Sequence, residues 1–133
     1  MANFVKGLTW LGARSDRYEA MLVFYRDTMG LELELQEMDF AIFRLPDGSK
    51  VEIFGPSDKS HTHFDSGPVG GFHVDDIDTA RAALERGGAQ FFGDVQRWAP
   101  TGDAWAHFRA PDGNVYELTQ PGPPPTMRTS TLL

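Results

Sequence analysis

Two glutamates end two copies of one sequence pattern, and together they could bind a cation or move a proton. Residues 43–52 read FRLPDGSKVE, and residues 108–117 read FRAPDGNVYE. Each copy predicts a strand, a tight turn and a second strand, because Pro fixes its own φ, Asp bonds the nearby backbone and Gly accepts a positive φ. Alternation along the second strand separates Glu52 and Glu117 from their apolar neighbours. The pattern therefore predicts two carboxylates at matching places in the two halves of the chain.

Histidines are the next group that could act beside these carboxylates. His73 shares one face of a predicted strand with Val69 and Gly71, so we expect it to look toward the same interior as the glutamates. His61 and His63 stand in a polar stretch between the two halves. They could fold over the opening of this interior, but solvent exposure is the ordinary expectation.

An aromatic wall is predicted on the strand that precedes the second turn. Trp105 and His107 are opposite in phase to Phe108. If Phe108 packs under a helix, as Phe43 should in the first half, Trp105 and His107 face the interior. Flat rings with a few polar groups are what a small organic ligand needs.

The order of predicted elements repeats once along the chain. Strand and helix patterns in each half follow the order β-α-β-β-β, which predicts the α+β class. We expect a single domain of residues 1–120, with a first module over 5–54, a linker over 55–68 and a second module over 69–120. A proline-rich tail, residues 121–133, follows.

Local signals set the predicted ends of the two helices. Ser15-Asp16 opens the first helix, and Glu19 stands in capping-box relation to Asp16. Asp75-Asp76 caps the second helix in the same way, and Gly30 is expected to end the first one in a left-handed conformation. The strand that follows alternates cleanly, with Leu31, Leu33 and Leu35 predicted to face inward.

Composition excludes several classes of function. The 133 residues contain no cysteine, so disulfides, thiolate metal ligands and a cysteine nucleophile are excluded. The net charge of −7 argues against nucleic acid, because phosphate binding needs a basic face. No apolar run is long enough to span a membrane and no secretion signal stands at the N-terminus, so we expect a cytoplasmic protein without a membrane partner.

The ordered duplication resembles the vicinal oxygen chelate superfamily, which includes glyoxalase, bleomycin-resistance proteins and extradiol dioxygenases. The resemblance rests on Phe24-Tyr25, on Met29-Gly30-Leu31 and on the two Pro-Asp-Gly-x-x-x-Glu endings, and it covers about residues 5–120. It implies that each module curls into half of an open barrel, that the halves face each other across a cleft, and that the protein is a homodimer. Whether the facing modules belong to one chain or to two subunits is left open.

The resemblance also implies where a divalent metal would bind. In metal-dependent relatives each module gives a His or Gln from its first strand and a Glu from its last strand. The matching residues here are Glu52 and Glu117, with Thr9 and Val69 on the first strands, or Trp10 and Gly70 after a slip of one residue. None of the first-strand side chains is a good ligand for such an ion. We therefore expect no tightly bound metal; if one binds, its ligands are Glu52, Glu117 and His73.

Three functions remain open from the sequence. The first is a metal-free protein that binds a small organic ligand, cationic or aromatic compounds included. The second is a divalent-metal-dependent lyase, isomerase or dioxygenase, and the third is a metal-free enzyme with a general base. The cleft residues common to these hypotheses are Glu52, Glu117, His73, Trp105, His107, Thr9 and Val69.

Overall fold

The first strand, β1 (Val5–Arg14), lies in the middle of a nine-stranded sheet. In the computed structural model, which describes residues 4–123, β1 runs parallel to β4 (Lys50–Phe54) and antiparallel to β5 (Val69–Val74). Strand β5 in turn runs parallel to β9 (Val115–Gln120). The two halves of a single chain are therefore joined edge to edge through β1 and β5.

The remaining elements follow the predicted order. The first half contains α1 (Tyr18–Val23), a π-helical turn (Phe24–Thr28), β2 (Glu32–Gln36) and β3 (Phe40–Arg44) before β4. The second half contains α2 (Ile77–Arg86), β6 (Gln90–Phe91), β7 (Gln96–Trp98) and β8 (Asp103–Arg109) before β9. Strand β7 was not predicted, and it pairs with β8. The sheet order is β2-β3-β4-β1-β5-β9-β8-β6, so the sheet is open and the predicted α+β class is confirmed.

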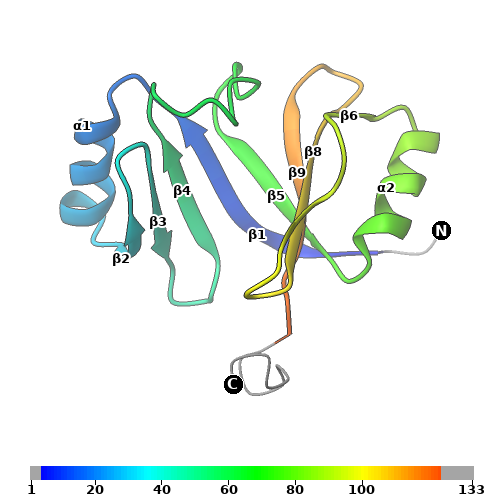
Figure 1. Ribbon diagram of the computed structural model, residues 1–133, viewed down its shortest axis with the longest axis horizontal. Coiled ribbons are helices and arrows are strands. Elements are labelled where there is room, and N and C mark those ends of the chain that lie inside the picture. Colours follow the sequence, from blue (N-terminus) through cyan, green and yellow to red (C-terminus); the bar gives the residue numbers. More distant parts are fainter. Residues whose placement is uncertain (1–3, 124–133) are drawn as a thin grey trace.

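The two helices lie at opposite ends of the molecule, with the sheet between them (Figure 1). Each helix covers its own apolar cluster, and Phe43 and Phe108 belong to these clusters as predicted. Under α1 the buried residues are Tyr18, Leu22, Tyr25, Ala41, Phe43, Val51 and Ile53. Under α2 they are Val74, Ile77, Ala80, Ala104, Ala106, Phe108 and Leu118.

Both clusters lie on the surface of the sheet that the helices cover. We call the opposite surface the inner face. Val51 and Ile53 point toward α1, so Glu52 between them points to the inner face. By the same alternation Glu117 and His107 point away from α2. The fold thus turns both carboxylates to the sheet surface that neither helix covers.

Two local predictions were wrong. Helix α1 begins at Tyr18 after Arg17, which makes no side-chain cap bond; Ser15 Oγ instead accepts the Arg17 N–H at 3.0 Å. A register shift between Leu33 and Leu35 interrupts the alternation of β2, so Leu35 is 41% exposed and does not face inward. Gly30 has the expected left-handed conformation, with φ of 73°.

The two helix starts give a matched test of capping. Asp76 caps α2, because its Oδ1 accepts the Thr79 N–H at 3.1 Å, whereas Asp16 makes no such bond in α1. We expect Asp76→Ala to lower the free energy of unfolding by about 1 kcal/mol and Asp16→Ala to leave it nearly unchanged. Urea unfolding of both variants at pH 7 measures this difference. Equal losses would show that Asp16 also caps its helix.

Two predictions concern the C-terminal tail and membrane-spanning segments. Of the predicted proline-rich tail, residues 124–133 lie outside the described residues. Within residues 4–123, neither helix is long and apolar enough to cross a membrane.

Candidate functional site

Glu117 is the most deeply buried ionisable group on the inner face, with 4% of its surface exposed. It stands directly opposite His107 in the β8–β9 pair, and its Oε1 lies 3.0 Å from His107 Nε2. The other ring nitrogen of His107, Nδ1, lies 3.0 Å from Nε2 of His63. These three side chains form a continuous hydrogen-bonded row, Glu117–His107–His63, which we call the relay.

Burial sets the charge of the relay. It raises the pKa of Glu117 well above its ordinary value and lowers the pKa of His107 to about 4. Burial, followed by the neighbouring His107, lowers the pKa of His63 to about 4 as well. A short Glu–His contact also fits an ion pair, but both pKa shifts favour the neutral pair at pH 7. In that state the Glu117 O–H can donate to His107 Nε2, which leaves the Nδ1–H of His107 to donate to His63.

Glu52 is held by a tryptophan. The Trp10 indole Nε1–H donates to Glu52 Oε1 at 3.2 Å. Burial raises the pKa of Glu52 to about 7, the Trp10 bond opposes this rise, and the nearby Glu117 adds to it. Lys50, two residues before Glu52 on β4, bonds Glu34 Oε2 at 3.0 Å. A carboxyl group with a pKa near 7 can either accept or donate a proton at neutral pH.

Two glycines make room for the Trp10 ring. Gly12 is the register partner of Glu52, and Gly71 is the register partner of Glu117. A Cβ at Gly12 would come within 2.0 Å of the Trp10 ring, and a Cβ at Gly71 would come within 2.8 Å of Trp10 Cβ. The tryptophan therefore fills the space above both glycines, beside the two glutamates.

The linker, residues 55–68, lies over one end of the inner face rather than out in solvent. Figure 1 shows it crossing between β4 and β5 at the top of the sheet. Its Phe64 is only 5% exposed and packs edge-on against Trp10 and His107, with ring centroids 6.1 and 5.0 Å away. His61 stacks on Phe54 at 3.7 Å, and His63 reaches the relay. The expectation that the linker histidines are exposed was therefore wrong.

An ion pair ties each side of the linker to a different half of the sheet. On the first side Arg14 Nη1 of β1 binds Asp58 Oδ2 at 3.1 Å. On the other side Arg109 Nη2 of β8 binds Asp65 Oδ2 at 3.2 Å. The histidines lie between these two points of attachment.

The structure places the other predicted site residues as follows. His73 Nε2 lies 3.7 Å from Oδ1 of exposed Asp75, and the imidazole that contacts Glu117 is that of His107. Thr9 lies at a register shift between Leu8 and Trp10, and the residue of β1 that reaches Glu52 is Trp10.

Val69 and Trp105 lie on the inner face. Val69 is buried with Phe54, Phe64 and Val115 under the linker. Trp105 stands opposite Thr119, two residues along β8 from His107, and is half-buried. The structure thus brings together Glu52, Glu117, His107 and Val69, with Trp105 beside them.

Sequence reasoning missed Phe64, favoured solvent exposure for His63, and gave Trp10 only as the alternative to Thr9 after a slip of one residue. A phenylalanine inside the polar run SHTHFDSG was a usable signal, because a solvated linker has no need for a large apolar side chain. No local signal marked the register shift that turns Trp10 inward.

The residues present do not fit a resident metal ion. Zinc and similar ions typically take three or four protein ligands. Within residues 4–123 no three His, Asp or Glu side chains are arranged to hold an ion. The register partners of the glutamates on the first strands are Gly12 and Gly71, which have no side-chain ligand atom, and one oxygen of each carboxyl group already bonds an indole or an imidazole.

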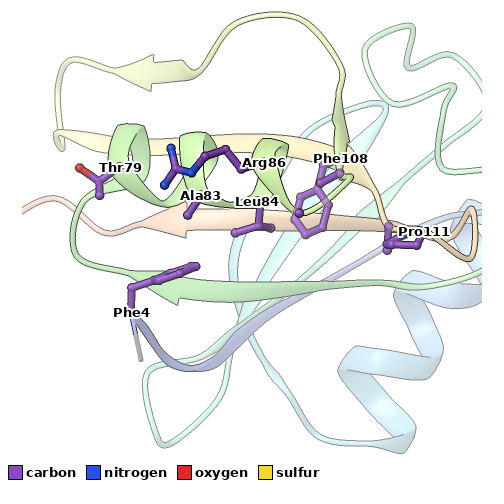
Figure 2. Close-up of a pocket in the computed structure, with 10 residues that line it drawn as sticks. Phe4, Thr79, Ala83, Leu84, Arg86, Phe108 and Pro111 are labelled. Carbon is purple, nitrogen blue, oxygen red and sulfur yellow. The ribbon is translucent and has the colours of Figure 1, made fainter. Parts of the chain in front are cut away.

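Two hollows in the described part of the chain lie elsewhere. One, of about 600 Å³, lies beside α2, with Thr79, Ala83, Leu84 and Arg86 on the helix and Phe4 on the other side (Figure 2). The other, of about 450 Å³, lies near the start of α1, next to Tyr18. Neither is lined by Glu52, Glu117 or a histidine.

Known structures share this architecture. Methylmalonyl-CoA epimerase from Mycobacterium tuberculosis superposes with a TM-score of 0.71 at 20% identity, over 92% of this chain and 93% of that chain. An epimerase variant from Streptomyces coelicolor in complex with 2-nitronate-propionyl-CoA gives 0.64 at 20% identity, over 88% and 98%. The Mn(II)-bound glyoxalase from Novosphingobium aromaticivorans gives 0.69 at 21% identity, over 87% of this chain and 39% of that one. At these identities the likeness establishes the fold.

The sequence comparisons establish the family. No curated protein matches the chain significantly. The model of the Glyoxalase/Bleomycin resistance protein/Dioxygenase superfamily matches residues 7–118, most of the chain. This match and the shared fold confirm the predicted resemblance: the chain belongs to the glyoxalase/bleomycin resistance protein/dioxygenase superfamily, the vicinal oxygen chelate group.

Proposed function

We propose that this protein binds a small organic molecule on the inner face without a resident metal ion. The observation that carries the proposal is the state of the two glutamates. Trp10 bonds Glu52 and His107 bonds Glu117, in the place where metal-dependent relatives are expected to hold an ion. Two neutral or near-neutral carboxyl groups suit hydrogen bonding to a ligand better than they suit charge neutralisation of an ion.

The ligand is expected to enter from the end of the inner face that the linker leaves uncovered. Around Glu52 and Glu117 that end carries the half-buried side chains of Ile42, Lys50, Trp105 and Thr119. Trp105 offers a flat ring for stacking, and Glu52 accepts a hydrogen bond or a cationic group once it is ionised. This combination favours an aromatic compound that carries an amine or hydroxyl group.

The proposal is tested by calorimetric titration with bleomycin and with a panel of small aromatic amines. We expect at least one compound to bind the wild type and to lose about tenfold or more in affinity in both Glu52→Gln and Trp105→Ala. Glu19→Gln, an exposed position on α1, is the matched control and should bind as the wild type does. A ligand whose affinity is the same in all four proteins would place the binding site away from the inner face.

A second function is favoured by the pKa of Glu52, which lies near 7. A base with this pKa can remove a proton next to a carbonyl group and return it at neutral pH. The solved relatives that act on acyl-CoA substrates make thioesters the natural probe for such chemistry. In D₂O, the enzyme hypothesis expects exchange of the α-hydrogen of propionyl-CoA, followed by NMR, with the exchange abolished in Glu52→Gln. If a ligand binds but none of its C–H hydrogens exchanges, the enzyme hypothesis is wrong and only the binding function remains.

A further inference from the structure

His63 reaches the inner face from the linker, a segment with no regular secondary structure of its own. Its Nε2 lies 3.0 Å from Nδ1 of His107, and no other described side chain bonds that nitrogen of His107. The imidazole also packs against the rings of Phe92 and Phe64, with centroids 4.6 and 5.0 Å away. His63 is thus placed by packing as well as by its hydrogen bond.

The linker is built to hold His63 in this position. Asp58 is buried and bonds both Arg14 and the backbone N–H of His61. Beyond His63, Asp65 bonds Arg109 of β8, the strand that carries His107. The attachment on each side fixes the path of the chain between residues 58 and 65.

The bond from His63 has a chemical consequence for Glu117. A neutral imidazole carries one N–H, so when one ring nitrogen donates a hydrogen bond, the other can only accept one. If His63 Nε2 accepts from His107 Nδ1–H, then His107 Nε2 has no proton and must accept from the Glu117 O–H. If His107 instead carries its proton on Nε2, it donates to Glu117, and the Glu117 O–H loses the acceptor that His107 offers in the first arrangement.

We propose that His63 is a positioning residue, which fixes His107 in the Nδ1–H form and so leaves His107 Nε2 as the acceptor for the Glu117 O–H. The role of this bond in ligand binding rests on the proposed function. In that role the linker supplies part of the site and sets the hydrogen-bonding state that a ligand meets on the inner face. Glu117 then presents a protonated carboxyl group to His107 rather than a charge.

Nitrogen-15 NMR of the imidazole rings in the ligand-free protein tests this directly. The chain has only four histidines, so each ring can be assigned by substitution. We expect His107 in the wild type at pH 7 to show a protonated Nδ1 and an unprotonated Nε2. A wild-type His107 with its proton on Nε2 would overturn the proposal, whatever the variants do.

Two variants separate positioning from packing. In His63→Leu, which keeps an apolar contact with Phe92 but has no acceptor, we expect the proton signal of His107 to move from Nδ1 to Nε2. In His63→Gln the side-chain oxygen can accept from Nδ1–H, so we expect the wild-type pattern to return. If His63→Leu retains the wild-type pattern, or His63→Gln loses it as His63→Leu does, the proposal is wrong. Since no ligand is present, a failed search for ligands leaves this result unaffected.

Discussion

Glu52→Gln is expected to stabilise the protein at pH 8 by an amount on the order of 3 kcal/mol. Burial raises the pKa of Glu52 from 4.5 to about 7, and one pKa unit corresponds to about 1.4 kcal/mol. The side chain of Gln keeps an oxygen that can accept the Trp10 indole N–H, so the variant removes the buried charge without removing its partner. This increase in stability arises at Glu52, the residue to which we assign ligand binding, so a more stable variant is expected to bind ligand less well.

The pH dependence gives the sign of this effect. The folded-state pKa of Glu52 is raised, so its stabilising contribution is fully present below pH 4.5 and is lost as the pH rises to about 7. We expect wild type and Glu52→Gln to be nearly equal in stability at pH 4 and to differ most at pH 8. Urea unfolding at pH 4, 6 and 8 measures the difference, with Glu19→Gln as the exposed control. A variant that is less stable than the wild type at pH 8 would show that the glutamate is held as a stabilised carboxylate.

His107→Ala is expected to lower the free energy of unfolding by about 3 kcal/mol at pH 7. The substitution removes a buried ring that packs against Phe64 and Trp10, and it leaves the Glu117 carboxyl group without its partner. A cavity and an unsatisfied buried polar group each contribute to such a loss.

His73→Ala is the matched control for this loss. The sequence predicts both histidines on the inner face; His73 is only half-buried, stands opposite Thr119, and its Nε2 lies 3.7 Å from exposed Asp75. We expect a loss of about 0.5 kcal/mol or less for His73→Ala, as for other partly exposed sites. Urea unfolding of both variants in one buffer compares them. Equal losses of unfolding free energy in His107→Ala and His73→Ala would show that the relay contacts of His107 add nothing to stability.

Much of the fold could be read from the sequence because its signals are local. The Pro-Asp-Gly turns, the capping Asp76 and the alternation of β4, β8 and β9 each depend on a few neighbouring residues. Alternation alone is enough to turn Glu52, Glu117 and His107 to the face opposite Phe43 and Phe108. Leu35 shows the limit of this reasoning, since one register shift reverses the alternation.

The surroundings of the glutamates could not be read in this way, because they depend on contacts between distant segments. Trp10 bonds a residue 42 positions away, and His63 bonds one 44 positions away. Lys50 is close to Glu52 in sequence and His73 lies on the strand beside β9, but Lys50 bonds Glu34, and His73 Nε2 lies 3.7 Å from Asp75. The linker looked solvated because its sequence is polar, whereas Asp58 and Phe64 are both buried in it.

We propose that Glu52 and Glu117 bind an organic ligand and hold no resident ion. Metal analysis of the full-length protein, purified without chelator from medium containing manganese, nickel and zinc, tests it most directly. We expect far less than one ion per chain, and a melting temperature that neither EDTA nor added divalent ions change by more than about one degree. One tightly held ion per chain, lost together with stability in EDTA and retained less well in Glu52→Gln and Glu117→Gln, would contradict the account.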